Sequence, residues 1–102
     1  MYMITHEKIK RIQLHIKEHI EKISGRKTPE VDKDISYMMI HEDVQTLIKH
    51  HNESQDSQHR NLLAKALLEV LDELFNYLSR VNCWDKKILK IYKLVLKSLY
   101  KI

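Results

Sequence analysis

Apolar residues recur every three or four positions along most of the chain, which is the spacing of one face of an α-helix. Residues that cap or break helices divide this pattern into four stretches, which predict helices at about 5–24, 29–51, 57–81 and 85–101. Short polar segments join the stretches, so neighbouring helices are expected to run antiparallel. The sequence therefore predicts an all-α protein, a single-domain antiparallel up-down four-helix bundle over residues 1–102.

The boundaries of the predicted helices carry typical capping residues. Thr5 is a suitable N-cap for the first helix, and Gly25 suits the left-handed position that follows a helix. Thr28 and Pro29 have the residue types favoured at the N-cap and the first helical position. Further along, Asp56 or Ser57 is expected to cap the third helix.

The fourth helix has a similar start signal. Asp85 is its expected N-cap, and Trp84 and Leu89 occupy the two positions of a hydrophobic staple, in which apolar side chains pack across the first turn. We therefore expect the chain to enter this helix with Trp84 packed against it.

The third predicted helix is the most apolar of the four. Its apolar residues cover almost half of its circumference, so it is expected to contact helices on two sides and to form the centre of the bundle. These residues are Leu63, Leu67, Leu68, Val70, Leu71, Leu74, Phe75 and Leu78.

The composition fits a soluble helical protein, with 43% hydrophobic and 31% charged residues. One glycine and one proline nearly exclude a turn-rich β fold, and they exclude the glycine-rich loops that bind phosphate. A single cysteine, Cys83, forms no internal disulfide and suggests a reducing compartment. The chain starts without the apolar run of a signal peptide and has no stretch of about 20 apolar residues, so we expect a cytoplasmic protein.

Basic charge is concentrated in the fourth predicted helix. The chain has 18 basic and 14 acidic residues, and the part before residue 86 has 12 basic and 14 acidic residues, a net charge of −2. The six lysines of this helix lie on the face opposite its apolar residues. This lysine stripe comprises Lys86, Lys87, Lys90, Lys93, Lys97 and Lys101.

The lysine stripe is open to two interpretations. It is either a solvated outer face, or an electrostatic contact surface for an acidic protein, a nucleic acid or an anionic membrane. Lysine forms weaker geometry-specific contacts with phosphate than arginine does, and Tyr100 is the one aromatic residue near this face. An acidic protein surface is therefore favoured over a nucleic acid, which stays as the alternative partner.

The second predicted helix has apolar residues on two faces. Val31, Ile35, Met38 and Met39 recur on the face opposite its main apolar stripe. Such a helix is either buried on both sides or meets a second partner, and methionines suit an adaptable contact surface. We interpret these four residues as an apolar contact surface for a partner or for a second copy of the chain.

Seven histidines raise the question of a metal site. His15 and His19 lie one helical turn apart, a spacing that can supply two metal ligands. No other segment obviously supplies the remaining ligands, so no metal and no cofactor is predicted, and these two residues are weak candidates. His41 and His51 are about 15 Å apart along a helix and are expected to be half-buried side chains with hydrogen-bonding neighbours.

No set of catalytic residues stands out in the sequence. Glu42 and Asp43 are adjacent, but side chains one residue apart on a helix point about 100° apart and do not act as a pair. Cys83 has no distinctive context. The sequence therefore predicts a protein that is not an enzyme and gives no indication of a small-molecule substrate.

These features together predict a small intracellular binding protein that acts through helix surfaces on a larger protein, as a regulator, inhibitor or assembly factor. In length, basic charge and helix order the chain is similar to the pediocin-like bacteriocin immunity proteins. That likeness implies a cytoplasmic four-helix bundle that binds at a membrane permease. The alternatives are a nucleic-acid-associated protein that uses the lysine stripe, and a histidine-based metal-binding bundle.

Overall fold

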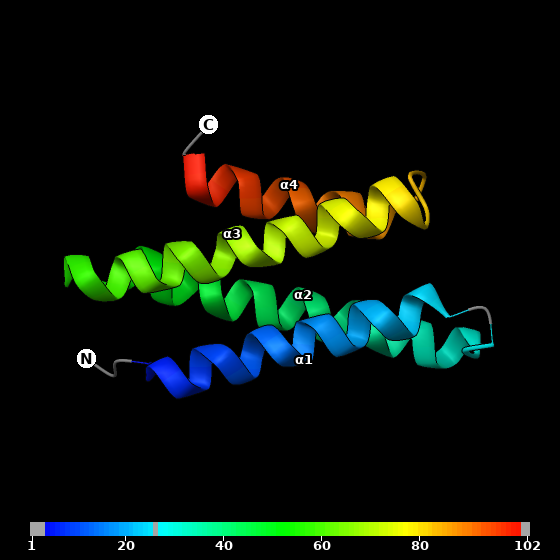
Figure 1. The fold of residues 1–102 in the computed structure, drawn as a ribbon, viewed down its shortest axis with the longest axis horizontal. Coiled ribbons are helices and arrows are strands. Elements are labelled where there is room, and N and C mark those ends of the chain that lie inside the picture. Colours follow the sequence, from blue (N-terminus) through cyan, green and yellow to red (C-terminus); the bar gives the residue numbers. More distant parts are fainter. Residues whose placement is uncertain (1–3, 26, 101–102) are drawn as a thin grey trace.

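Four helices hold almost all of the residues that this computed structural model describes, which are residues 4–25 and 27–100. Successive helices run in opposite directions along the long axis (Figure 1), as short connections favour. The predicted antiparallel up-down four-helix bundle is confirmed. The helices are α1 (His6–Ser24), α2 (Glu30–Glu53), α3 (Ser57–Arg80) and α4 (Lys86–Tyr100).

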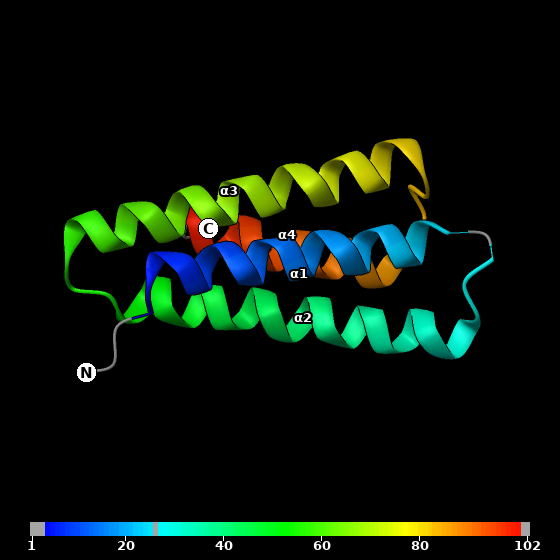
Figure 2. The same ribbon diagram turned by 60° about the horizontal axis from the view of Figure 1, so that its bottom comes forward.

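The four helices are not equivalent in their packing. Both α2 and α3 pack against all three other helices, whereas α1 and α4 do not pack against each other within the described residues. The connection between α1 and α2 and the connection between α3 and α4 lie at the same end of the molecule (Figure 2). The predicted central helix α3 therefore shares this role with α2, and α4 is held by these two helices alone.

The core follows the apolar periodicity of the sequence. Leu63, Leu67 and Leu74 of α3 are completely buried, as are Ile40 and Val44 of α2. Burial of apolar surface is the main favourable term in folding, so this face of α3 carries much of the stability of the bundle.

Two of the predicted caps are confirmed by their hydrogen bonds. The backbone N–H of Lys8 donates to Oγ1 of Thr5 over 3.1 Å, and that of Gln58 donates to Oδ1 of Asp56 over 3.2 Å. Each cap satisfies a backbone donor that has no partner within its own helix.

The connection between α1 and α2 differs from its prediction. Gly25 has φ −76° and ψ 129°, an extended conformation rather than the left-handed one. Its N–H donates to the carbonyl of Lys22 over 3.2 Å. The N-cap of α2 is Pro29 in place of Thr28, and the helix begins at Glu30 with no side-chain cap.

Three predicted packing residues are exposed instead. Leu68 and Phe75 of α3 are 44% and 54% exposed, and Trp84 is 86% exposed, so the predicted staple with Leu89 does not form. Leu68 and Phe75 each follow a completely buried leucine, Leu67 and Leu74, so they point about 100° away from the packed face of α3, and Trp84 lies in the connection before α4. Phe75 retains a side contact with the ring of Tyr92, at 6.4 Å between centroids.

The buried carboxylate of Asp85 joins three helices. Its Oδ2 accepts hydrogen bonds from the hydroxyl groups of Tyr37 in α2, over 2.5 Å, and Tyr77 in α3, over 2.6 Å. Its Oδ1 accepts from the backbone N–H of Ile88 over 3.2 Å, which confirms Asp85 as the cap of α4. We call Asp85, Tyr37 and Tyr77 the Asp85 cluster.

Replacing a buried leucine of α3 is expected to destabilise the bundle strongly. Leu74→Ala should lower the free energy of unfolding by about 2–5 kcal/mol, because it removes buried methyl groups and leaves a cavity. The neighbouring Phe75→Ala is a matched control whose cost should be clearly smaller, since Phe75 is half exposed. Urea unfolding curves measure both, and equal costs would show that α3 is rotated from this arrangement.

The Asp85 cluster is expected to lose stability in alkali. Burial and the hydrogen bond to Asp85 raise the pKa of Tyr37 from its usual 10.0 to about 12. The folded state therefore binds the hydroxyl proton of Tyr37 more tightly than the unfolded chain does. The stability that protonated Tyr37 contributes is complete below about pH 10 and is lost as the pH rises from 10 towards 12. Urea midpoints between pH 8 and 12 should fall less steeply in Tyr37→Phe than in the wild type, and equally steep profiles would contradict this account.

Candidate functional site

Most of the lysine stripe lies on the outer side of α4. Lys86, Lys90, Lys93 and Lys97 are exposed, and no ion pair among the described residues involves any of the four. They point away from the helix face that packs against α2 and α3. Lys101 lies outside the described residues. Four like charges with no acid between them on one helix face form a concentrated positive surface.

Lys87 departs from the predicted stripe. Its Nζ lies 3.2 Å from Oδ1 of Asp34 in α2 and 4.9 Å above the ring centroid of Tyr37. The side chain therefore leans over the boundary between α2 and α4. Both partners of this ion pair are more than half exposed, so its contribution to stability is small.

The second apolar face of α2 is exposed over its first two and a half turns. Val31 is 69% exposed, Ile35 47% and Met38 55%, while Ile40, on the opposite side, is completely buried. Met39 is half-buried and lies between Ser36 and Asp43 on the side of α2 that meets α1. We therefore define the α2 outer face as Val31, Ile35 and Met38.

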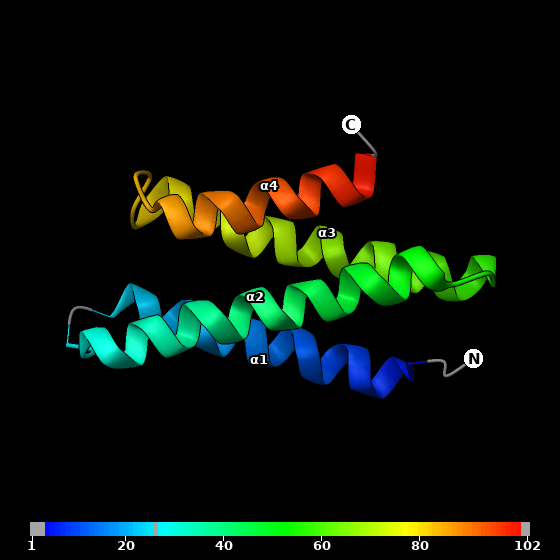
Figure 3. The same ribbon diagram turned by 180° about the vertical axis from the view of Figure 1, so that it is seen from behind.

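The α2 outer face and the lysine stripe lie on neighbouring helices. Figure 3 shows α2 and α4 running in the same direction along one side of the molecule. The ion pair between Asp34 and Lys87 joins the two helices near their N-terminal ends. A single large partner can therefore touch apolar and positive surface together.

A chain of hydrogen-bonded side chains connects α1 to α2. Nε2 of His15 lies 3.0 Å from Nε2 of His19, and the two rings are nearly perpendicular. Nδ1 of His15 contacts Oδ2 of Asp43, and Nδ1 of His19 lies 2.9 Å from Oγ of Ser36. His15 and His19 are four residues apart on α1, and Ser36 and Asp43 are seven residues apart on α2. Each pair therefore lies on one side of its helix. We call these four residues the histidine chain.

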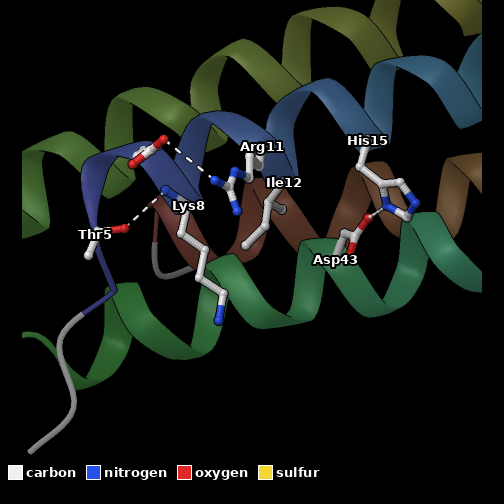
Figure 4. A pocket seen from close by; sticks show the side chains of 7 residues that line it. Thr5, Lys8, Arg11, Ile12, His15 and Asp43 are labelled. Carbon is white, nitrogen blue, oxygen red and sulfur yellow. Dashed lines mark hydrogen bonds and ion pairs between the residues drawn. The ribbon is translucent and has the colours of Figure 1, made fainter.

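One end of the histidine chain opens onto a surface cavity of about 530 Å³. His15 and Asp43 line it together with Lys8, Arg11 and Ile12 near the start of α1 (Figure 4). The other end, at Ser36, is buried. The chain therefore runs from solvent into the contact between two helices.

The structure brings the weak metal candidates together but adds no third ligand. No group of three or more histidine, cysteine, aspartate or glutamate side chains in the described part of the chain is arranged to hold a metal ion. Sequence reasoning missed Asp43 and Ser36 as partners of the histidines. Their seven-residue spacing places both on one side of α2, but it does not show which helix that side meets.

The electrostatics of His19 follow from its surroundings. Burial lowers the pKa of His19 below its usual value of 6.5, and the neighbouring His15 and Lys22 add to this effect. His19 is therefore held in its neutral form near neutral pH, as a hydrogen-bonded member of the chain.

The other side chains singled out from the sequence lie apart. Cys83 is exposed in the connection between α3 and α4. His41 and His51 are half-buried, as predicted, and Nε2 of His41 lies 3.4 Å from Nε2 of Gln45. Glu42 is exposed while Asp43 faces His15, so these neighbouring carboxylates point different ways, as the helical geometry predicts.

Comparisons with known proteins give no family for this chain. No protein-family model matches it, and neither a curated protein nor a solved structure matches it. Within the described residues, no helix combines the length and the apolar character needed to cross a membrane. The functional argument therefore rests on the surfaces and side chains described above.

Acidification is expected to destabilise the contact between α1 and α2. Because the pKa of His19 is lowered on folding, the unfolded chain binds a proton at His19 more readily than the folded protein does. The stability that neutral His19 provides is complete above about pH 6.5 and is lost as the pH falls below that value. The urea midpoint should fall less between pH 7 and 5 in His19→Gln than in the wild type. His6→Gln is a matched control on the same helix, and a His19→Gln profile as steep as that of this control would contradict the account.

Proposed function

We propose that this protein is a small non-enzymatic binding protein that contacts a larger protein partner through its helix surfaces. The exposure of the α2 outer face carries this proposal. Val31, Ile35 and Met38 keep about half or more of their surface in contact with water, on successive turns of one helix. Adjoining apolar side chains of this size are a common feature of protein contact surfaces. A methionine among them suits an adaptable contact.

The charged residues beside the α2 outer face support a protein partner. Protein interfaces typically have an apolar centre and a polar, solvent-accessible rim. Asp34 and Lys87 border the apolar face, and the lysine stripe of α4 lies next along the surface. In this proposal the apolar face supplies most of the affinity, and the lysines attract and orient an acidic region of the partner.

A nucleic acid is the second candidate partner because of one aromatic side chain. Tyr100 is 59% exposed and follows Lys97 by three residues on α4, so it lies beside the lysine stripe. An exposed ring next to lysines is able to stack on a base while the lysines contact phosphates. Gel-shift assays at low and moderate salt with single- and double-stranded probes test this candidate.

A charge placed in the α2 outer face is expected to weaken partner binding without unfolding the protein. Met38→Asp should keep the helical circular dichroism and the melting temperature of the wild type, because the side chain is 55% exposed. The partner is first recovered with wild-type protein from the source cells, and titration should then show at least about a tenfold loss of affinity. Gln45→Asp is the matched control, exposed two turns further along α2, and should bind normally. If Met38→Asp and Gln45→Asp bind the partner equally well, the α2 outer face is not the binding surface.

Removing charge from the lysine stripe is expected to change the salt dependence of binding. Replacing Lys90, Lys93 and Lys97 together with glutamine should leave the melting temperature unchanged or slightly higher, because like charges one turn apart repel. Association should slow, and its dependence on salt concentration should flatten.

The control for this triple variant removes the same charge elsewhere. Lys10, Lys17 and Lys27 are exposed outside α4, and their replacement with glutamine lowers the net charge equally. If both triple variants slow association to the same extent, the effect comes from net charge, and the stripe is a solvated face.

A further inference from the structure

The histidine chain has one consistent arrangement of hydrogens when both histidines are neutral. The carboxylate of Asp43 accepts a hydrogen bond from Nδ1–H of His15, which leaves Nε2 of His15 as an acceptor. Nε2–H of His19 then donates to it, and Nδ1 of His19 accepts from the hydroxyl of Ser36. All three hydrogen bonds therefore point from Ser36 towards Asp43.

One added proton reverses most of this arrangement. A positively charged His15 donates from both nitrogens, to Asp43 and to Nε2 of His19, so His19 must carry its own proton on Nδ1. Nδ1–H of His19 then donates to Oγ of Ser36, whose hydroxyl hydrogen turns away to another acceptor. Serine hydroxyls within helices commonly donate to the carbonyl four residues earlier. The number of hydrogen bonds along the chain is unchanged, but two of the three change direction.

We propose that the Ser36–His19–His15–Asp43 chain is a proton-operated switch built into the contact between α1 and α2. It takes up one proton at the cavity, where His15 pairs with Asp43, and passes the change to buried Ser36 through the tautomer of His19. A second proton would place two positive rings with their nitrogens 3.0 Å apart on α1, so it enters only when the two side chains turn apart and the hydrogen bond between them is lost.

The charged groups around the pair favour a single added proton. Those that act on His19 come from both helices: Asp43 from α2, and Glu18, Lys22 and His15 from α1. Lys8 and Arg11 line the same cavity as His15, and Glu7 pairs with Arg11. The strongest charged influences on the pKa of His19 therefore come from α1 and α2. Asp43 is thus the acid in direct contact with the pair, and it neutralises one positive charge.

The switch connects solvent acidity to the helix that carries the α2 outer face. Ser36 follows Ile35 directly in α2, and the chain is a polar contact inside an otherwise apolar packing surface. Reversal keeps every hydrogen bond of the chain between α1 and α2, whereas the second proton breaks the His15–His19 hydrogen bond and interrupts the chain. This inference stands without the proposed partner, since it concerns only the two helices.

The tautomers of the two histidines test the switch directly. Protein labelled with ¹⁵N at histidine, kept with a metal chelator, is followed by long-range ¹H–¹⁵N correlation spectra from pH 8 to pH 5. At pH 8, His19 should carry its proton on Nε2 and His15 on Nδ1. As His15 binds the first added proton and becomes positively charged, the proton of His19 should move to Nδ1.

Two variants show whether the chain causes the reversal. Asp43→Asn removes the charge that holds the added proton, so His19 should stay in its Nε2–H form over the whole range. In Ser36→Ala the buried Nδ1–H lacks its acceptor, so the reversal should require a lower pH, and this variant decides the matter if Asp43→Asn fails to fold. His6→Gln should behave as the wild type.

Three results would overturn the proposal. The first is a His19 tautomer that stays the same while His15 titrates in the wild type. The second is a reversal that persists unchanged in the variants of Asp43 and Ser36. The third is a His19 tautomer that changes when the chelator is left out, which would assign the pair to a bound metal ion instead.

Discussion

The buried carboxylate of Asp85 is the contact on which the placement of α4 depends. Two tyrosine hydroxyls and one backbone N–H donate to it, from α2, α3 and the first turn of α4. Because α4 does not pack against α1 within the described residues, its contacts with α2 and α3 alone hold it in the bundle. Removing the carboxylate would leave buried donors without a partner, at a cost of about 1–3 kcal/mol for each such group. The cluster thus fixes where α4 begins, and with it the direction in which the lysine stripe faces.

Two adjacent residues of α2 link this cluster to the histidine chain. Tyr37 donates to Asp85 on the side of α4, and Ser36 contacts His19 on the side of α1. Neighbouring residues of a helix point about 100° apart, so these two contacts hold α2 from two sides. A rotation of α2 that buried Ile35 and Met38 would break both contacts. The exposed apolar face is therefore set by specific polar contacts, and not only by the distribution of apolar residues.

Periodicity and capping residues predicted the fold, because they are local properties of the chain. The four helices follow from the spacing of apolar residues, and the caps at Thr5 and Asp85 follow from their residue types. Asp56 was one of two candidate caps for α3. The spacing also showed a second apolar face on α2 but left open whether it is buried. The prediction failed at the edge of the apolar face of α3: Phe75 is apolar and follows the buried Leu74, but it points away from the packed side of the helix and is half exposed. It also failed for contacts between distant residues.

The sequence does not indicate that His15 contacts Asp43, 28 positions away, or that Tyr37 contacts Asp85, 48 positions away. Such pairs form only once the bundle sets the register of one helix against another. The candidate surfaces, in contrast, were visible in the sequence because exposure depends mainly on helical periodicity. The structure leaves fewer residues in these candidate surfaces, because Lys87 pairs with Asp34 and Met39 lies on the side of α2 that meets α1.

The central claim is that α2 is held with Ile35 and Met38 outward and Met39 turned towards α1. The oxidation rates of Met38 and Met39, measured by mass spectrometry in folded and urea-unfolded protein, test it most directly because these neighbours serve as controls for each other. In folded protein, Met38 should be oxidised at close to its unfolded rate and Met39 should be clearly protected. If Met39 is oxidised as fast as Met38, or faster, α2 is rotated from this arrangement and its outer face is not the surface described.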